Sequence, residues 1–191
     1  MQTIIFDFFG VVVSEIAPFV LPRYMSAADV VRYRATLVQE ADLGYITQKA
    51  FFDRLAGIAG VSAKQLEDEF WAHVKVDSDT VALIEALKTK YRVALLTNAI
   101  VPFVRQIMAR HDLARLFDTI MVSSEEHMIK PDPAFFQHLL TRMDVQPEDA
   151  IFLDDNPVNI EGAKNAGIAG ILFTTAPQAA RELYERFSIA P

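Results

Sequence analysis

Residues 2–13 read QTIIFDFFGVVV, and this stretch indicates the fold. Thr3 to Phe6 is a short, β-branched apolar run with no alternating polar residue, which is typical of a buried central strand in a parallel sheet. The run ends on Asp7. An acid at the carboxyl end of such a strand points into the crevice where open α/β sheets bind ligands. Asp7 equally fits a plain strand end that caps a turn, so this stretch alone leaves both interpretations open.

Further strands of the same kind follow in the second half of the chain. The apolar runs that predict them are Arg92–Leu96, Thr119–Val122, Ala150–Leu153 and Gly170–Phe173. Helical patterns separate these runs, and no internal repeat is present. Strands that alternate with helices predict a parallel sheet with right-handed crossovers. We therefore expect an α/β fold, with a Rossmann-like core of three layers.

Residues 14–76 interrupt this alternation. The segment lacks a strong strand signal, and Ser26, Thr47 and Ser62 each precede a helical pattern as plausible caps. It is too long for a simple crossover after the first strand. We predict an all-helical cap subdomain over residues 14–76, inserted into a core domain made of residues 1–13 and 77–191. The aromatic stripes of the cap are interpreted as packing rather than as a cofactor site.

Composition excludes several classes of function. Of the 191 residues, 52% are hydrophobic and none is cysteine, which excludes a disordered chain, disulfides and thiolate metal sites. The net charge of −7 without a Lys/Arg cluster argues against nucleic acid as a partner. No apolar run is long enough to span a membrane, and the N-terminus lacks the pattern of a signal peptide. A cytoplasmic location is expected, and both a monomer and a homodimer remain open.

Polar residues follow nearly every predicted strand. These residues are Asp7, Thr97, Asn98, Lys130, Asp154 and Asp155. The carboxyl ends of parallel strands share one edge, so we expect these side chains to meet in one crevice. Carboxylates there could hold Mg²⁺ or act as a nucleophile, and a lysine, a hydroxyl and an amide could contact a phosphoryl group. Taken singly, each residue also fits a helix cap, a surface charge or a turn.

Four motifs connect the chain to a known family. They are FDFFGVV around Asp7, LLTN ending at Asn98, IKPDPAFF at Lys130, and FLDDNPVNIEGAKNAG over Phe152–Gly167. Together they resemble the haloacid dehalogenase-like (HAD) hydrolase superfamily over nearly the whole chain. The branch that looks most similar contains α-D-glucose-1-phosphate phosphatases and the amino-terminal phosphatase domain of epoxide hydrolases. The segment ADLGYIT, residues 41–47, resembles that branch too.

The resemblance implies a Mg²⁺-dependent phosphatase of a small phosphorylated metabolite. Asp7 would be the nucleophile that forms an aspartyl-phosphate. Asp7, the backbone carbonyl of Phe9 and the carboxylate of Asp155 would bind the metal.

Further residues would support this chemistry. Thr97 and Asn98 would contact the phosphoryl group, and Lys130 would bind substrate and orient Asp7. Asp154 would adjust the metal site, Asn159 would hold the loop after the fourth strand, and Gly10 would support the first motif.

Position 9 departs from the common phosphatase pattern. The family usually carries a second Asp two residues after the nucleophile as general acid and base, and here that residue is Phe9. Phenylalanine cannot transfer a proton, and such help is typically worth about 10²–10⁴-fold in rate. The glucose-1-phosphate phosphatase-like branch also lacks this Asp. Glu15 and Asp42 are candidates to replace it.

Two other functions remain open at this stage. A 2-haloacid dehalogenase would use Asp7 without a metal, and Phe9 resembles the aromatic residue of that branch. Asp154 and Asp155 argue against it, because neighbouring carboxylates without a cation repel one another. The second alternative is a ligand-binding protein on a catalytically lapsed HAD fold. The retained Asp7, Lys130 and Asp155 argue against that interpretation.

Overall fold

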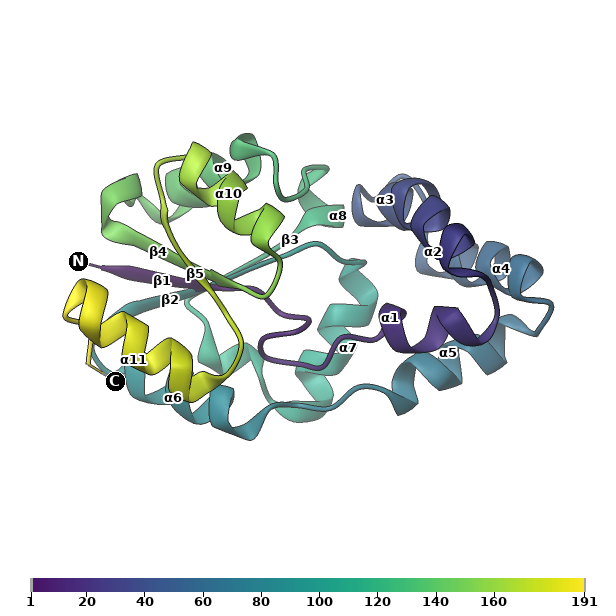
Figure 1. Cartoon of the computed structure of the whole chain (residues 1–191), viewed down its shortest axis with the longest axis horizontal. Coiled ribbons are helices and arrows are strands. Elements are labelled where there is room, and N and C mark those ends of the chain that lie inside the picture. Colours follow the sequence, from purple (N-terminus) through teal and green to yellow (C-terminus); the bar gives the residue numbers. More distant parts are fainter. Residues whose placement is uncertain (1, 191) are drawn as a thin grey trace.

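The computed structural model describes residues 2–190, and its centre is a parallel sheet of five strands in the order β3-β2-β1-β4-β5. The strands are β1 (Thr3–Phe6), β2 (Arg92–Thr97), β3 (Thr119–Val122), β4 (Ala150–Asp154) and β5 (Ala169–Leu172). All neighbouring pairs are parallel, as predicted. The central strand β1 has Phe6 in register with Leu95 of β2 and with Leu153 of β4. Figure 1 shows the strands running side by side through the left half of the molecule.

Helices cover both faces of the sheet, which gives the three layers that the sequence predicts (Figure 1). The helices α6 (Ser78–Lys88), α7 (Val101–His111) and α11 (Ala176–Phe187) pack on one face. The helices α9 (Pro133–Met143) and α10 (Pro157–Asn165) pack on the other. Alternate residues of β1 serve the two cores: Ile4 and Phe6 face the first set of helices, and Ile5 faces the second.

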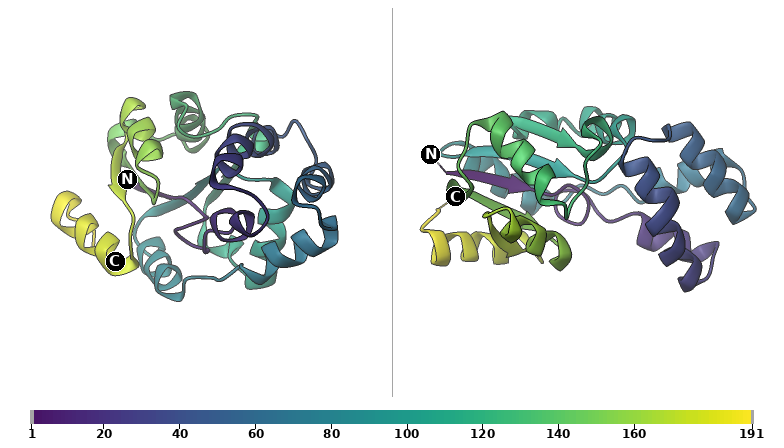
Figure 2. Two further views of the ribbon diagram at one scale, coloured as in Figure 1. Left: turned by 45° about the vertical axis from the view of Figure 1, so that its right-hand side comes forward. Right: turned by 90° about the horizontal axis from the view of Figure 1, so that it is seen from above.

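A helical region follows β1 and lies beyond one end of the sheet (Figures 1 and 2). Its elements are α1 (Ala17–Val20), η1 (Leu21–Arg23), α2 (Ala27–Tyr33), the π-helical turn η2 (Arg34–Val38), α3 (Gln39–Asp42), α4 (Gln48–Ala59) and α5 (Ala63–Ala72). Ser26, Thr47 and Ser62 cap α2, α4 and α5 through side-chain oxygens, as expected from their residue type. No strand interrupts this region among the residues that the structure describes.

The chain enters and leaves the helical region through two adjacent segments. The backbone N–H of Ser14 donates to Lys75 O at 2.9 Å, and that of Asp77 donates to Val12 O at 3.0 Å. The Ser14 hydroxyl adds a hydrogen bond to His73 O at 2.6 Å. These bonds join the two connections side by side at positions 12–14 and 73–77.

Several element ends differ from what the sequence pattern predicts. The pattern predicts a helix over residues 77–91 capped by Ser78 or Asp79, but Asp77 caps α6, because its carboxylate accepts from Thr80 N at 2.7 Å. It predicts that Ser123 and Ser124 end the third strand, and the structure places them at the start of the short helix α8 (Ser123–Glu126). It predicts a last helix over Ala179–Phe187, whereas α11 begins at Ala176 behind the cap Thr175. Turn chemistry and capping decide these boundaries, and apolar periodicity does not report them. The short helices η3 (Ala114–Leu116) and η4 (Pro147–Asp149) complete the chain.

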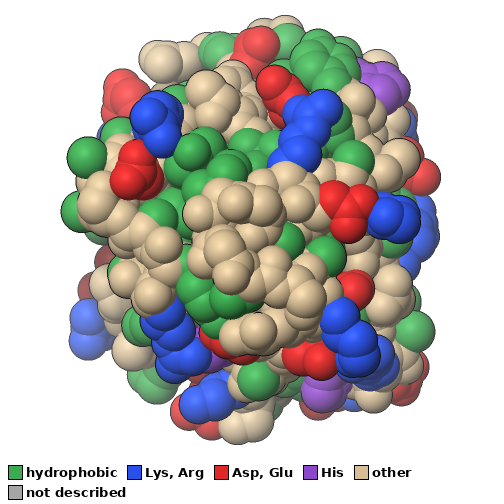
Figure 3. All heavy atoms as spheres, turned by 90° about the vertical axis from the view of Figure 1, so that its right-hand side faces the viewer, with side chains coloured by type: hydrophobic (Ala, Val, Ile, Leu, Met, Phe, Trp, Pro, Cys, Tyr) green, Lys and Arg blue, Asp and Glu red, His purple; other side chains and the backbone are tan. Residues whose placement is uncertain are grey.

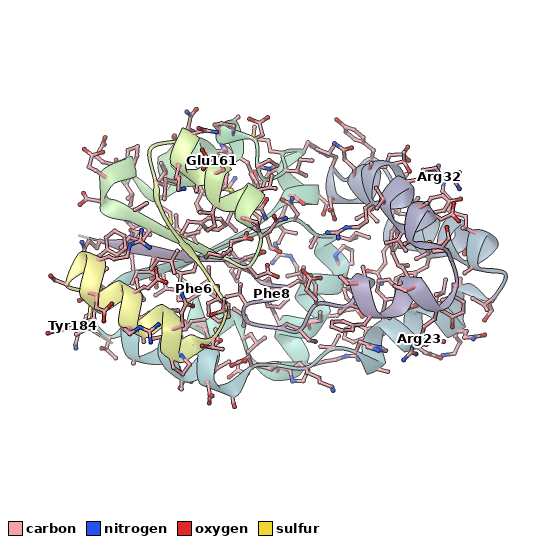
Figure 4. All side chains as sticks on the ribbon, in the orientation of Figure 1. Phe6, Phe8, Arg23, Arg32, Glu161 and Tyr184 are labelled. Carbon is pink, nitrogen blue, oxygen red and sulfur yellow. The ribbon has the colours of Figure 1, made fainter. Side chains whose placement is uncertain are left out.

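The end of the molecule formed by the helical region carries charges of both signs. Figure 3 views the end of the molecule formed by the helical region, where Lys and Arg side chains lie interspersed with Asp and Glu. In Figure 4, Arg23 and Arg32 point outward from this region, while Phe8 lies between it and the sheet. Residues 2–190 contain no helix that is both long and apolar enough to cross a membrane.

Candidate active site

The order of the strands brings the predicted site residues together. The chain leaves β1 toward β2 on one side, and β4 later joins β1 on the other side. Ligands of open α/β sheets bind at this kind of switch point, beyond the carboxyl ends of the strands. Asp7 follows β1, and Asp154 and Asp155 lie at the end of β4. The backbone N–H of Asp7 donates to Leu153 O at 2.9 Å, which fixes the nucleophile candidate beside them.

Lys130 is the buried cation of the site. It is 3% exposed, and its Nζ lies 2.7 Å from Asp7 Oδ1 and 2.7 Å from Asp154 Oδ2. Burial on its own lowers the pKa of Lys130, but the two carboxylates outweigh that effect and raise the pKa above its ordinary value. Lys130 is therefore charged at neutral pH. A buried charge is tolerable only when it is paired and hydrogen-bonded in this way.

Asp154 is fully buried and every direction around its carboxylate is used. Besides Lys130, it accepts from Asn156 N at 2.8 Å and from Asn159 Nδ2 at 3.1 and 3.0 Å. Asn159 thus ties α10 to the end of β4. With so many donors already in place, Asp154 orients its neighbours rather than offering free oxygens.

Asp7 and Asp155 are the carboxylates that keep free capacity. The carboxylate oxygens of Asp7, Asp154 and Asp155 lie within 4.8 Å of one another. Burial is the largest cause that raises the pKa of Asp7 well above its usual value, and Asp154 adds to it, while Lys130 opposes it. Burial and the charge of Asp154 also raise the pKa of Asp155. The protein environment alone therefore disfavours the charged form of both carboxylates. A bound divalent cation would stabilise that form.

The donor set fits a hard cation. Mg²⁺ binds through one or two carboxylates, carbonyl oxygens and waters, together with substrate phosphate. Among the described residues, nothing donates a hydrogen bond to the carbonyl oxygen of Phe9, so this oxygen is free to act as a ligand beside Asp7 and Asp155. Gly10 makes room for this arrangement. It has φ +81°, and a Cβ there would lie 2.3 Å from Asp155 Oδ2.

Thr97 and Asn98 differ in what they can offer to a substrate. Thr97 is 1% exposed, lines the cavity described below, and its hydroxyl has no partner in the part of the chain that the structure describes. Such a buried orphan needs a partner that the protein does not supply. The Asn98 side chain is instead engaged at both ends: Nδ2 donates to Lys130 O at 2.9 Å, and Oδ1 accepts from Lys130 N at 2.8 Å. Asn98 also lines the cavity, so its contact with a phosphoryl group stays a prediction, and its side chain holds the backbone of Lys130.

These residues form the floor of a cavity of about 360 Å³ between the sheet and the helical region. Its far walls are largely apolar. They include Ile16, Leu21, Val38, Phe51, Phe52, Phe70 and Phe103. Glu15, Arg34 and Asp42 also line the cavity. The site thus has a charged end at the sheet and an apolar end among the helices.

Sequence reasoning missed Arg34. The guanidinium lines the cavity and forms no ion pair with the residues in the described range. The helical pattern that follows the predicted cap Ser26 extends to Gln39 without a break, whereas the structure inserts the π turn η2 at Arg34. Periodicity gives no signal for a π turn, although such turns are frequent at functional sites. From the sequence, Phe19 and Tyr45 fit either the site or the cap's own core; the structure leaves them 61% and 67% exposed and outside the cavity lining.

Comparisons with known proteins agree with this geometry. The family model "haloacid dehalogenase-like hydrolase" matches residues 1–167. The chain is 28% identical to drimenol cyclase drtB of Aspergillus calidoustus over 78% of its own length and 29% of that protein. It is 32% identical to sesquiterpene phosphatase astK of Aspergillus oryzae over 58% of its length and 57% of that protein. The chain therefore spans less than two thirds of the length of each of these relatives.

A solved structure shares the fold across most of the chain. The HAD family enzyme bt-2542 of Bacteroides thetaiotaomicron, in complex with magnesium and inorganic phosphate, superposes with a TM-score of 0.73 and 20% identity, over 91% of this chain and 94% of that one. At 20% identity, this similarity is evidence for the fold alone. The family match covers most of the chain, including all four motifs, and the chain belongs to the haloacid dehalogenase-like hydrolases.

Proposed function

We propose that this hydrolase is a Mg²⁺-dependent phosphatase that works through an aspartyl-phosphate on Asp7. The observation that carries the proposal is the pairing of Asp7 with Lys130 at 2.7 Å, beside the second free carboxylate, Asp155. The charged end of the cavity thus combines a nucleophile, a fixed cation and a cation site. Relatives named as phosphatases and a related fold with magnesium and phosphate bound support the same reaction class.

Each residue has a defined task in this scheme. Lys130 and the backbone N–H of Phe8, 2.7 Å from Asp7 Oδ1, hold one carboxylate oxygen in place, and Oδ2 accepts no hydrogen bond from the described residues. The Thr97 hydroxyl supplies a hydrogen bond to the phosphoryl group. Asp7, Asp155 and the Phe9 carbonyl would hold Mg²⁺, and a bound cation would offset negative charge on the phosphoryl group.

Asn98 and Asp154 position Lys130 from opposite ends. Asn98 holds the backbone of Lys130 through two hydrogen bonds, and Asp154 accepts a hydrogen bond from the Lys130 ammonium group at 2.7 Å. Effects of their substitution should therefore pass through Lys130.

The helical region offers a binding surface for the organic part of the substrate. We propose that residues 14–76 act as a cap that closes over a phosphate monoester, with the phosphate at Asp7 and the organic group among Phe51, Phe52 and Phe70. Those rings offer no hydrogen bonds, so they favour an apolar alcohol over a sugar. The sesquiterpene phosphatase among the relatives is named for such a substrate.

A 2-haloacid dehalogenase is the second candidate, because Phe9 is aromatic. Its chemistry needs Asp7 but no cation, and Asp155 then adds a repulsive charge without a task. We rank it below the phosphatase for this reason.

The experiment compares phosphate release and chloride release by the purified chain, with Mg²⁺ and with EDTA. We expect phosphate release from p-nitrophenyl phosphate and from an alkyl phosphate, with loss of activity in EDTA. Asp7→Asn should lower kcat by about 10⁴–10⁶-fold, as for loss of a nucleophile. Asp53→Asn, on the exposed face of α4, is the matched control and should stay at the wild-type rate. Chloride release from 2-chloropropionate that persists in EDTA would instead establish the dehalogenase.

A further inference from the structure

Phosphoryl transfer at this site lacks an evident proton donor for the leaving group. The ring of Phe9 occupies the position after Phe8 and packs with it edge to face at 5.1 Å, and it stacks on Phe103 at 6.4 Å. This part of the cavity wall is therefore apolar. An alcohol leaves phosphorus poorly unless its oxygen receives a proton, so another group in the cavity must act.

Two carboxyl groups line the cavity outside the metal cluster, and their surroundings differ. Burial and then the charge of Asp155 raise the pKa of Glu15, while Arg34 and the backbone N–H of Ile16 oppose that rise. Glu15 therefore lies on the side of the cation site. Asp42 accepts no hydrogen bond from the residues the structure describes, and the charged groups that face it are Lys130 and Arg34.

The end of α3 holds Asp42 firmly over the site. The residue after it, Leu43, bonds through its carbonyl to His127 Nδ1 at 2.7 Å. Gly44 follows, with φ +73°, and a Cβ there would lie 2.2 Å from Ser124 O. Tyr45 stacks on His127 at 6.4 Å. Three consecutive residues thus dock on α8 of the core, and the side chain just before them cannot drift away from the cavity.

In-line transfer sets where the proton is needed. Asp7 attacks phosphorus from the sheet side, so the bond that breaks points to the opposite side, toward the cap. Asp42 lines the cavity from the cap, and its carboxyl group has no hydrogen-bond partner within residues 2–190. Burial raises its pKa to about 7, with Lys130 and Arg34 opposing that rise. A carboxyl with such a pKa is partly protonated at neutral pH and can both give and take a proton.

We infer that Asp42 is the general acid and base of this hydrolase, supplied by the cap in place of the acid that Phe9 replaces; this rests on the proposed phosphatase activity. In the first step, a bond forms between Asp7 and phosphorus, the bond from phosphorus to the leaving oxygen breaks, and that oxygen takes the proton of Asp42. In the second step, water gives a proton to the Asp42 carboxylate and attacks phosphorus. The bond to Asp7 then breaks, releasing inorganic phosphate and restoring the protonated Asp42.

The test uses two substrates that differ in their need for an acid. p-Nitrophenolate leaves without a proton, whereas an alkoxide does not. For Asp42→Asn we expect kcat on an alkyl phosphate to fall about 10²–10⁴-fold. On p-nitrophenyl phosphate the same variant should release a burst of one p-nitrophenolate per enzyme molecule and then turn over slowly, because only hydrolysis of the aspartyl-phosphate still needs the base. Asp42→Glu should recover part of both rates.

Controls keep the inference separate from the proposed function. Glu40→Gln alters the same helix, but Glu40 pairs with Arg54 on the surface and should leave both rates unchanged. If the wild-type protein releases no phosphate from either substrate, the proposed phosphatase activity itself is wrong. If wild type is active and Asp42→Asn loses less than about threefold on the alkyl phosphate, or loses both substrates equally without a burst, Asp42 is not the acid. Loss in Glu15→Gln instead would assign the role to Glu15.

Discussion

The charged residues on the two walls of the cavity differ in how they are paired. At the sheet edge, Lys130 and Asp154 are buried and held in a continuous network, with Asn98 and Asn159 bonded to them. In the cap wall, Arg34 and Asp42 form neither an ion pair nor a side-chain hydrogen bond with the rest of the described chain. Several other charged residues of the cap pair on its outer surface, as Lys49 does with Asp53.

This difference separates two requirements of catalysis. Phosphoryl transfer needs a nucleophile and a cation that do not move, and a saturated network supplies that rigidity. The leaving group, in contrast, must be met by groups that are free until the substrate arrives. An unpaired cap wall provides those groups, at the cost of some stability. The comparison predicts large effects for substitutions at the sheet edge and small ones on the cap surface.

Replacing Lys130 should produce the largest loss of stability. In Lys130→Met, the carboxylates of Asp7 and Asp154 lose their shared cation while they remain buried. Breaking a buried pair costs about 3–5 kcal/mol in the free energy of unfolding. Urea denaturation in magnesium-free buffer measures it. The double variant Lys130→Met, Asp154→Asn should recover part of the loss, because it leaves one unpaired charge fewer. A single-variant loss below about 1 kcal/mol would contradict the network.

Replacing Gly10 or Gly60 with alanine tests the same contrast between the sheet edge and the cap. Both have positive φ, +81° and +69°, but a Cβ at Gly10 meets Asp155 at 2.3 Å, whereas a Cβ at Gly60, after α4 in the cap, meets nothing within 4 Å. Gly60→Ala should cost only the left-handed conformation, about 1–2 kcal/mol. Gly10→Ala should cost about 1 kcal/mol more, and it should weaken Mg²⁺ binding about 10–100-fold by displacing Asp155.

Thermal unfolding and a magnesium titration by calorimetry read both effects. Gly60→Ala, which lies far from Asp155, should bind Mg²⁺ as the wild type does. Equal magnesium affinity in both variants would show that Asp155 is not a metal ligand.

The sheet edge was predictable from the sequence, whereas on the cap wall the sequence indicated Glu15 and Asp42 but not Arg34. Parallel strands put Asp7, Thr97 and Asp155 at one edge whatever the loops do, so strand ends alone bring them together. The partner of Asn98 depends on where the loop at Lys130 folds back, which no pattern reports. In the cap, the π turn decides that Arg34 faces the cavity, and docking of residues 43–45 on α8 decides the place of Asp42. Both depend on tertiary contacts rather than on local propensity.

Asp42 should make stability fall as the pH rises. Its pKa is about 7 in the folded chain and near its ordinary value of 3.8 in the unfolded one, mainly because folding buries it. Between these values the folded chain binds more protons, so the free energy of unfolding decreases from about pH 4 to about pH 7 and then levels. Each pKa unit corresponds to about 1.4 kcal/mol. Partial exposure of the carboxyl reduces the total to on the order of 2 kcal/mol.

Asp42→Asn removes this penalty. Between pH 4.5 and pH 8, the free energy of unfolding of this variant should therefore rise relative to that of the wild type by on the order of 2 kcal/mol. Urea denaturation without Mg²⁺ measures it. Asp68→Asn, exposed on α5 and paired with Lys64, serves as control and should run parallel to wild type. Parallel curves for Asp42→Asn as well would mean that its carboxyl titrates normally.

The smallest effect is expected at Glu40, two residues before Asp42 on the same helix. Its carboxylate pairs with Arg54 of α4 at 2.8 Å, and both side chains are about half exposed. Exposed pairs are worth about 0.2–1 kcal/mol and weaken with salt, so Glu40→Gln should lower stability by no more than that, and less at 1 M NaCl. The apolar contacts of Leu37, Ala41 and Phe51 hold α3 on α4 instead. A loss above about 2 kcal/mol would mean that charge, not packing, fixes α3, and Glu40 would then position Asp42 rather than serve as its control.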